Sequence, residues 1–339
     1  MIVQPSVTPV PADHGRPGGP EPLLRIERLS IDLPGLGGPV RIVDDISFSV
    51  AAGRTTGLIG ESGSGKTMTA TAIIGLLPAG AAVSGRMWWQ DRDLVTMAEK
   101  ERRQLRGHDI AMIFQDPQSA LDPTQTIGRQ VGEILRRDGM PARQVRRTVI
   151  DLLGRVGVPD PQTRHAQYPH QYSGGLRQRA MVATALAGKP KIILADEPTT
   201  ALDVTVQARI LALLRRIREE EGTAMLLVSH DLRVMAHVAD EVVVMYAGRL
   251  CEIGSGREVL HRPAHPYTRA LVVSVPAVRS KTAIAEPLPG SPANPADRPS
   301  GCPFHPRCAK AQDRCRVEIP LMRPIAAQRQ VACHYPEDV

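Results

Sequence analysis

The chain has 339 residues, a formal net charge of +7 and 42 % apolar residues. This length suffices for one sizeable domain and a smaller unit. Aromatic residues make up only 3 %, which weakens a role in binding single-stranded nucleic acid, because such sites stack bases on aromatic rings. No apolar run approaches the ~20 residues of a membrane span, and the first residues lack a basic-then-apolar signal pattern. We therefore expect a cytosolic protein that reaches a membrane only through a partner.

Arginine residues gather in three clusters along the chain. A basic surface can bind nucleic acid or anionic lipid, whereas the alternative is a set of solvated helix faces. We favour solvated faces because no basic stripe alternates with aromatic residues. The clusters are Arg102, Arg103 and Arg106; Arg136 and Arg137; and Arg143, Arg146 and Arg147.

The first part of the chain predicts a disordered segment followed by strands. Residues 1–22 are rich in Pro and Gly and have no periodicity, which is typical of disorder. Residues 23–33 and 41–50 alternate in polarity, so we expect antiparallel strands with one buried face. Residues 55–59 (TTGLI) predict a short buried strand, and residues 68–77 predict a helix that Pro78 ends.

The middle of the chain is helical between roughly residues 99 and 187, with clear stretches at 130–137 and 145–156. Continuous apolar runs at 191–195, 224–228 and 241–245 predict strands covered on both faces, as in a parallel α/β sheet. From residue 275 the composition changes, and residues 287–299 predict a stiff, extended proline-rich linker. The predicted fold class is α/β, with an antiparallel β subdomain, an inserted helical subdomain and a small cysteine-containing C-terminal extension.

Residues 60–67 read GESGSGKT and match G-x-x-x-x-G-K-[ST], a loop whose backbone N–H groups surround nucleotide phosphates. Glycines suit the tight turn, the lysine places its charge at the β- and γ-phosphates, and the threonine hydroxyl holds Mg²⁺. The strand before the loop and the helix after it aim a helix N-terminus at the anion. The predicted nucleotide contacts are Gly60, Glu61, Ser62, Gly63, Ser64, Gly65, Lys66, Thr67 and Met68.

Two acidic residues follow the predicted strand at 191–195, in the sequence IILADEP. Asp196 lies at the end of the strand, where it can hold Mg²⁺, and Glu197 can polarise the water that attacks the γ-phosphate. His230 ends another strand in LLVSHD and can hydrogen-bond the γ-phosphate, although a lone histidine there is more often an ordinary strand-end residue.

Further segments occur in a diagnostic order: IFQDP at residues 113–117, YSGGLRQR at 172–179 and ALD at 201–203. With the phosphate loop, DEP and SHD, this order resembles the nucleotide-binding subunit of an ABC transporter. The resemblance implies a nucleotide-binding domain over residues 23–258 and an extension over residues 259–339. It also implies a head-to-tail dimer in which ATP lies between one phosphate loop and the other subunit's signature. The residues assigned by resemblance are Gln115 at Mg²⁺ or the attacking water, and Ser173, Gly174, Gly175, Gln178 and Asp203 at the nucleotide.

Two features depart from the family pattern. Leu176 and Arg177 precede Gln178 where many cassettes have a shorter SGGQ, a variation of the peptide-transport branch. The family stacks an aromatic ring on adenine from a loop before the phosphate loop, but residues 31–43 contain no aromatic residue. Leu33 or Val40 then supplies an apolar contact instead.

Residues 195–208, 265–271 (HPYTRAL) and 301–308 (GCPFHPRC) look like the D-type ATPase of the dipeptide, oligopeptide and nickel importers. The resemblance implies ATP-driven peptide import, a related F-type ATPase, two permease subunits and an extracytoplasmic peptide-binding protein. It places the chain at the cytoplasmic face of the membrane, without nucleic acid. Two other classes stay open: a soluble ABC protein acting on DNA or ribosomes, and a metal-binding regulatory module.

Four of the five cysteines fall in the tail, namely Cys302, Cys308, Cys315 and Cys333, whereas Cys251 is an apolar filler in a predicted strand. A reducing cytosol disfavours disulfides, and four thiolates can ligate zinc or an iron–sulfur cluster. The wide spacings fit zinc poorly, and the tail resembles family members that carry a structural [4Fe–4S] cluster. His261 and His265 are four residues apart, but the nearby prolines argue against a helical metal pair.

Overall fold

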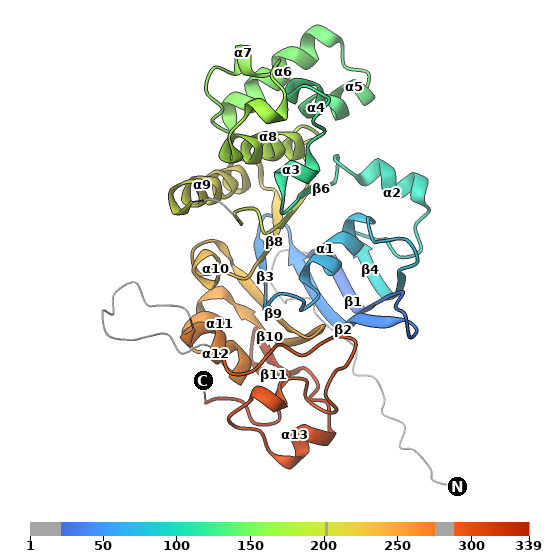
Figure 1. Ribbon diagram of the computed structural model, residues 1–339, viewed down its shortest axis with the longest axis vertical. Coiled ribbons are helices and arrows are strands. Elements are labelled where there is room, and N and C mark those ends of the chain that lie inside the picture. Colours follow the sequence, from blue (N-terminus) through green and yellow to red (C-terminus); the bar gives the residue numbers. More distant parts are fainter. Residues whose placement is uncertain (1–21, 201–202, 275–287, 339) are drawn as a thin grey trace.

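The computed structural model describes residues 22–200, 203–274 and 288–338 (Figure 1). Of the segment predicted to be disordered, residues 1–22, all but Pro22 lie outside the described residues, and Pro22 begins a strand. In the described part, an eight-stranded sheet has the order β11-β12-β10-β9-β3-β8-β7-β6, and a four-stranded sheet has the order β2-β1-β4-β5. The helical block covers one end of the large sheet, and the C-terminal extension lies at the opposite end of the molecule.

The large sheet is parallel in its centre and antiparallel at one side. Its parallel strands are β6 (Ile110–Ile113), β7 (Ile192–Asp196), β8 (Ala224–Ser229), β3 (Thr55–Ile59) and β9 (Glu241–Tyr246). Its antiparallel strands are β10 (Arg249–Ser255), β12 (Arg329–Val331) and β11 (Arg323–Ala326). The small antiparallel sheet comprises β2 (Val40–Ala51), β1 (Pro22–Leu33), β4 (Ala82–Trp89) and β5 (Arg92–Asp93).

The apolar runs form strands because each of their two faces packs against a separate core. In β7, Ile192 and Leu194 belong to the core shared with the small sheet and the first helix. Ile193 and Ala195 belong to the core shared with the helical block. Successive side chains of a strand point to opposite faces, so a run without polar residues is the pattern of a doubly covered strand. The predicted parallel α/β sheet is confirmed.

The helices form three groups (Figure 1). The first is α1 (Lys66–Ile74) with α2 (Glu99–Leu105). The helical block holds α3 (Pro117–Ala120), α4 (Ile127–Val131), α5 (Glu133–Arg137), α6 (Ala142–Arg155), α7 (Pro161–Arg164), η1 (Pro169–Gln171) and α8 (Gly174–Leu186). The rest are α9 (Val204–Glu221), α10 (Leu232–Val238), α11 (Gly256–His261), α12 (Pro266–Val273), η2 (His305–Arg307) and α13 (Asp313–Val317). Among the described helices, none combines the length and the apolar character that crossing a membrane needs.

Several element boundaries differ from the prediction. The helix predicted for residues 68–77 ends at Ile74, because Gly75 adopts the left-handed conformation (φ 77°) and closes the last turn. Residues 110–113 form strand β6 inside the region predicted to be helical, since they pair with β7. The predicted helix at 130–137 is divided at Gly132, where a Cβ atom would lie 2.7 Å from the side chain of Val145.

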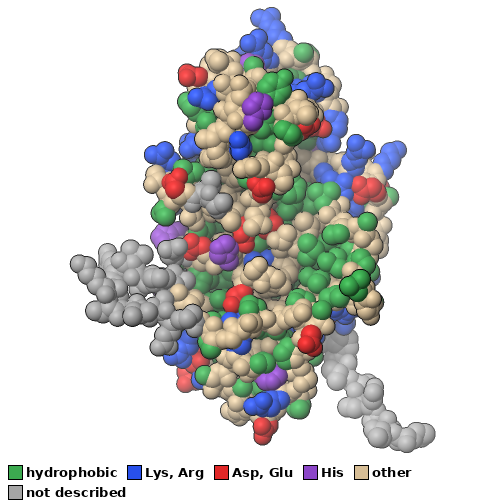
Figure 2. Space-filling model, in the orientation of Figure 1, with side chains coloured by type: hydrophobic (Ala, Val, Ile, Leu, Met, Phe, Trp, Pro, Cys, Tyr) green, Lys and Arg blue, Asp and Glu red, His purple; other side chains and the backbone are tan. Residues whose placement is uncertain are grey.

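Two arginines of the first cluster, Arg102 and Arg106, contact the end of α1, whereas Arg103 is exposed as predicted. Arg102 donates hydrogen bonds to the carbonyl oxygens of Ala72 (2.7 Å) and Ile73 (3.3 Å). Arg106 donates to Ile74 and Gly75 (both 2.8 Å), so the two guanidinium groups satisfy the free carbonyls at the end of α1. Figure 2 shows Lys and Arg side chains gathered over the helical block and around α2.

The predicted extended linker is packed where it is described. Leu288 and Ala293 pack against the core of the large sheet, and the Ala293 N–H donates to the Tyr246 hydroxyl (3.2 Å). Residues 288–299 are therefore part of the folded unit, whereas residues 275–287 lie outside the described part of the chain.

A buried ion pair joins the extension to the large sheet. Glu252 on β10 is fully buried, and Arg329 on β12 donates to its carboxylate with both Nη2 (2.6 Å) and Nε (3.1 Å). The same carboxylate accepts the N–H groups of Ala264 (3.0 Å) and His265 (2.9 Å) at the start of α12. One buried charge thus holds β12 and the segment before α12 in place.

We predict that Arg329→Met lowers the free energy of unfolding by about 3–5 kcal/mol, because it leaves the Glu252 carboxylate buried without a cation. Urea denaturation of the full chain measures the change. Arg314→Met is the matched control, since Arg314 is an exposed arginine of the same extension, and it should leave the midpoint unchanged. Equal midpoints for the two variants would contradict the account.

Candidate functional site

The predicted site residues follow neighbouring parallel strands and meet at one edge of the large sheet. Strand β3 ends before the phosphate loop, β7 ends at Asp196, and β8 ends just before His230. The register places Ile59 beside Ser229 and Asp196 beside Val228, so the three strands finish at the same level. Ligands of open α/β sheets bind outside the carboxyl ends of such strands.

The phosphate loop depends on glycine at two positions. Gly60 has a φ of 154°, and a Cβ atom there would lie 2.2 Å from the Met245 carbonyl oxygen. Gly65 has a φ of 101°, and a Cβ atom there would lie 3.2 Å from the Ile42 carbonyl oxygen, directly before α1 begins at Lys66. Only glycine adopts these conformations readily at such close approach. Ser62 and Gly63 are exposed at the top of the loop, whereas Ser64 is buried and Met68 packs partly against the core.

Lys66 lies inside the loop with 5 % of its surface exposed. Its Nζ donates to the carbonyl oxygens of Gly60 and Glu61 (both 2.8 Å) and lies 3.3 Å from the Ser64 Oγ. Burial lowers the pKa of Lys66, and the nearby carboxylates of Glu197, Asp196 and Glu61 oppose that shift. The ammonium group is therefore fixed at the centre of a ring of oxygens.

Thr67 and Asp196 are in direct contact. The Thr67 Oγ1 donates to Asp196 Oδ1 at 3.1 Å, and Asp196 is 3 % exposed. Burial raises the pKa of Asp196, and the hydrogen bond from Thr67 partly offsets that shift. A hydroxyl and a carboxylate beside a phosphate loop are oxygen ligands that suit Mg²⁺.

Glu197 is held by three polar side chains. Its Oε1 lies 3.0 Å from His230 Nδ1, and its Oε2 accepts from Gln115 Nε2 (3.0 Å) and Thr200 Oγ1 (2.8 Å). Burial raises the pKa of Glu197, but the hydrogen bonds from His230 and Thr200 outweigh it and leave the pKa below its ordinary value. The residue has a φ of 44°, a strained conformation that recurs at functional sites. Sequence reasoning missed Thr200, although it stands in the same DEPTT segment.

The signature residues lie on another element. Ser173 and Gly174 are exposed at the start of α8, and nothing lies within 4 Å of a Cβ atom built on Gly174. Within the described part of the chain, no hydrogen bond or ion pair connects residues 173–178 to the phosphate loop. The open N-terminus of α8 presents amide groups that a separate anion can approach.

Two residues assigned to the nucleotide, Gln178 and Asp203, differ in their surroundings. Gln178 is 2 % exposed and its Nε2 has no hydrogen-bond partner, so its side chain lies inside the block and not beside Ser173. The nucleotide contact of Gln178 stays a prediction, with its side chain buried in the chain described here. Asp203 is exposed and accepts from the Val206 N–H (2.9 Å), which caps α9. Residues 201–202, which precede it, lie outside the described residues.

The four tail cysteines line one small cavity of about 20 Å³, together with His265 and Phe304. Burial raises the pKa of Cys302 and of Cys333 to about 11. Across the described residues, however, no three His, Cys, Asp or Glu side chains are grouped closely enough to hold a metal ion. The predicted metal centre, with iron–sulfur or zinc, is therefore not supported by this arrangement. His265 instead accepts the Tyr267 N–H through Nδ1 (3.0 Å) and caps α12.

Comparisons with known proteins agree with this geometry. Residues 43–200 match the family model described as ABC transporter. The chain is 44 % identical over 318 residues to the dipeptide transport ATP-binding protein DppD of Escherichia coli strain K12, covering 93 % of this chain and 97 % of that protein. The chain belongs to the ABC transporter ATP-binding proteins. As a member of this family, it is an ABC-type ATPase.

The rest of this ABC ATPase also has relatives. Residues 251–315 match the model described as the C-terminal region of oligopeptide/dipeptide transporters. The chain is 45 % identical to DppD of Bacillus subtilis strain 168, over 87 % of this chain and 89 % of that protein. Among solved structures, the dimeric cassette MJ0796 has a TM-score of 0.63 at 25 % identity, covering 69 % of this chain and 99 % of that one. The cbiO1 protein of Clostridium perfringens has a TM-score of 0.60 at 25 % identity, covering 71 % and 91 %.

Two contacts at the site come from the extension and were not predicted. The Tyr267 hydroxyl accepts the N–H of Glu61, and Arg307 pairs with the Glu61 carboxylate. Tyr267 belongs to the HPYTRAL segment and Arg307 to GCPFHPRC, and the sequence marked both segments without assigning these residues a role.

Proposed function

We propose that this chain is the ATP-hydrolysing subunit that energises import of dipeptides or oligopeptides across the cytoplasmic membrane. The observation that carries the proposal is the arrangement of Glu197, with His230 and Gln115 on its carboxylate, beside the Thr67–Asp196 pair. The names of the relatives, dipeptide transport ATP-binding proteins, favour peptides as cargo. Those names also favour an importer over a protein acting on DNA or ribosomes.

The chemistry follows from the charges at the site. Glu197 accepts a proton from a water molecule whose oxygen attacks the γ-phosphorus, the bond to the β–γ bridging oxygen breaks, and ADP and phosphate leave. The Glu197 carboxylate is oriented by Gln115 and His230. Thr67, Asp196 and Gln115 would hold Mg²⁺, which neutralises phosphate charge when bound. Lys66 and the loop amides bind the phosphates.

The exposed signature supports a two-subunit site. One chain offers its phosphate loop and catalytic carboxylate, while Ser173, Gly174 and Gly175 present a second set of amides on a different element. Two chains arranged head to tail would enclose each ATP between these surfaces, with Asp203 near the junction. The second ATPase is the same chain or a related F-type chain. ATP binding closes the pair, and hydrolysis opens it again.

The helical block offers a surface for a permease. A groove of about 300 Å³ lies between α4 and α6, and its lining includes Gly128, Arg129, Val145 and His165. An apolar floor with arginines at its rim suits an amphipathic helix carrying acidic residues. We assign this groove to a cytoplasmic helix of one of two permease subunits. An extracytoplasmic binding protein would deliver peptides to these permeases. The chain would then sit peripherally at the cytoplasmic face of the membrane, with residues 23–258 as the ATPase domain and 259–339 as the extension.

We also propose that Cys302, Cys308, Cys315 and Cys333 ligate a structural [4Fe–4S] cluster. The support is that all four thiols line one cavity and that the donor set is purely sulfur, which suits iron–sulfur clusters and zinc. When bound, the cluster would hold together a tail that is too short to build its own core.

We predict that Glu197→Gln lowers ATP turnover by roughly 10²–10⁴-fold, because the amide cannot accept the proton of the attacking water. The ATP dissociation constant should stay close to that of the wild type, since the loop is untouched. Steady-state phosphate release and equilibrium binding measure the two quantities. Glu219→Gln, a change on the exposed face of α9, is the control and should retain normal turnover. Normal turnover in Glu197→Gln would refute the assigned role.

We predict that protein purified without oxygen contains about four iron atoms per chain and absorbs visible light. Cys308→Ser should lose most of this iron, whereas Cys251→Ala should retain it, because Cys251 is buried in β10 and is not one of the four proposed ligands. Iron analysis and visible absorption spectra check both results. If the wild-type protein purified without oxygen contains stoichiometric zinc, or no metal, the cluster is ruled out.

A further inference from the structure

The extension contacts the phosphate loop directly at Glu61. The side chain of this residue has no role in the proposed binding of phosphates. Arg307 donates to both carboxylate oxygens of Glu61, with Nη1 to Oε2 at 2.6 Å and Nη2 to Oε1 at 3.0 Å. The backbone N–H of the same Glu61 donates to the hydroxyl of Tyr267 (2.8 Å). Both partners come from the part of the chain that follows the ATPase core, in η2 and α12.

The Arg307 guanidinium is itself fixed on every side. Its side chain is 5 % exposed, its Cζ lies 5.7 Å from the centre of the Tyr246 ring, and its Nη1 also donates to the Tyr246 hydroxyl (3.3 Å). Its Nε donates to the Pro289 carbonyl (2.8 Å). Burial lowers the pKa of Arg307, but the hydrogen bonds to Glu61 and Tyr246 raise it above its ordinary value. A buried two-pronged pair of this kind fixes both distance and direction.

The aromatic residues beneath this pair link it to the cysteine-bearing segment. Phe304 packs against Tyr246 and Tyr267 at ring distances of 5.3 Å each, and the two tyrosines lie 4.6 Å apart. Phe304 and Arg307 both belong to the turn between Cys302 and Cys308, where the Arg307 N–H donates to the Phe304 carbonyl (3.0 Å). A displacement of either cysteine therefore moves the side chains that contact the loop.

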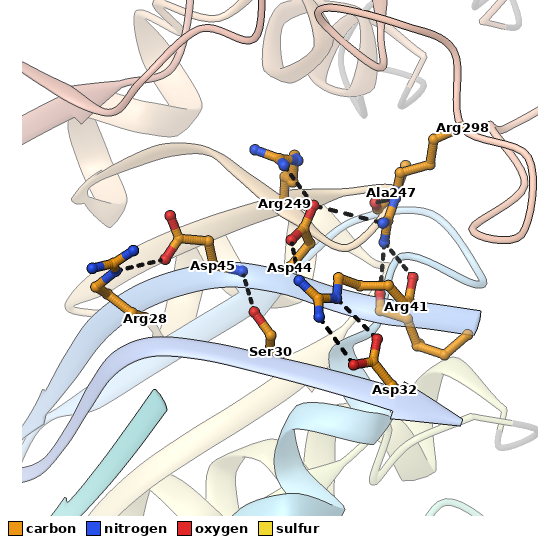
Figure 3. Close-up of polar contacts among 10 residues, drawn as sticks. Arg28, Ser30, Asp32, Arg41, Asp44, Asp45, Ala247, Arg249 and Arg298 are labelled. Atoms are coloured by element: carbon orange, nitrogen blue, oxygen red, sulfur yellow. Dashed lines mark hydrogen bonds and ion pairs between the residues drawn. The ribbon is translucent and has the colours of Figure 1, made fainter. Parts of the chain in front are cut away.

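A second arginine of the extension supports the turn that contacts the phosphate loop. Arg298 donates to the carbonyl oxygens of Ala247 (2.6 Å) and Arg41 (2.7 Å), as Figure 3 shows, and it joins the turn after β9 to β2. The next residue, Gly248, donates its N–H to the Ser64 carbonyl of the phosphate loop (3.0 Å). The loop is thus supported at Glu61 by direct contacts and at Ser64 through one intervening turn.

These contacts bear on phosphate binding because the loop works only when its amides converge. Lys66 is anchored to the carbonyl oxygens of Gly60 and Glu61, so a shift of Glu61 also displaces the lysine that meets the phosphates. The Glu61 side chain points out of the loop toward the extension and has no role in the proposed chemistry. Its pairing therefore acts on the position of the loop.

We propose that Arg307 is a positioning residue for ATP binding: through Glu61 it makes the affinity of the phosphate loop depend on the folded state of the cysteine-bearing extension. The inference rests on the proposed function, in which residues 60–68 bind ATP. The extension then regulates the nucleotide site as well as stabilising the fold. Tyr267 contributes to the same effect through the Glu61 N–H.

Equilibrium binding of Mg-ATP to the full chain tests this role, alongside turnover at saturating ATP. Arg307→Met should raise the ATP dissociation constant about tenfold, the size expected for losing a charge-assisted pair, and change saturated turnover less than about twofold. Arg307→Lys should bind ATP more tightly than Arg307→Met. The double variant Glu61→Arg with Arg307→Glu should bind ATP more tightly than Glu61→Arg or Arg307→Glu alone. Tyr267→Phe, which removes one acceptor atom, should weaken binding about threefold.

Arg314→Met is the matched control, since Arg314 is an exposed arginine of the same extension that pairs with Glu318, and it should bind ATP normally. Unfolding midpoints establish that each variant is folded. If Arg307→Met does not fold, the single variants Arg307→Lys and Tyr267→Phe take its place. Wild-type affinity in folded Arg307 and Tyr267 variants would overturn the proposal. Failure of the wild type itself to bind ATP would instead refute the proposed function.

Discussion

The site depends on three neighbouring parallel strands, β3, β8 and β7, that end together at one edge of the large sheet. Because each strand is covered on both faces, its position is fixed by packing and not by the polar residues that follow it. The loop after β3 brings Lys66 and Thr67, β7 brings Asp196 and Glu197, and the turn after β8 brings His230. Residues widely separated in sequence thereby meet within hydrogen-bonding distance.

The same sheet explains why the extension can influence the site. Strand β12 pairs with β10, and the buried Glu252–Arg329 pair fixes this junction. Tyr267 and Arg307, which lie between β10 and β12 in the chain, then meet Glu61 of the phosphate loop. In the proposed function, the loop binds phosphates with its amides and contacts the extension through Glu61. The signature on α8 lies outside this unit, which is consistent with an enclosure completed by another chain.

The sequence predicts those parts of the structure that depend on local pattern. The strands β3, β7, β8 and β9 follow from apolar runs, and Lys66, Thr67, Asp196 and Glu197 follow from motifs at their ends. What it misses depends on distant partners. By sequence, β6 resembles part of a helical region, but it is a strand because it pairs with β7. Residues 288–299 resemble a linker, but they are folded because they contact Tyr246 and the core.

The same reason accounts for the missed and misplaced side chains. Arg102 and Arg106 read as a basic cluster because nothing local reveals that the carbonyls at the end of α1 lie beside them. Gln178 reads as part of the exposed signature, but its side chain is buried, which the motif alone does not reveal. Arg307 meets Glu61 across 246 residues of sequence, and no motif spacing encodes such a contact.

The central claim is that the phosphate loop binds ATP as one unit with the extension behind it. Hydrogen–deuterium exchange of the full chain, with and without Mg-ATP, tests this claim most directly. We predict slower exchange in residues 60–68, where amides bind phosphates, and also in residues 265–268 and 304–308, which contact Glu61. Unchanged exchange in residues 60–68 upon addition of ATP would contradict the account.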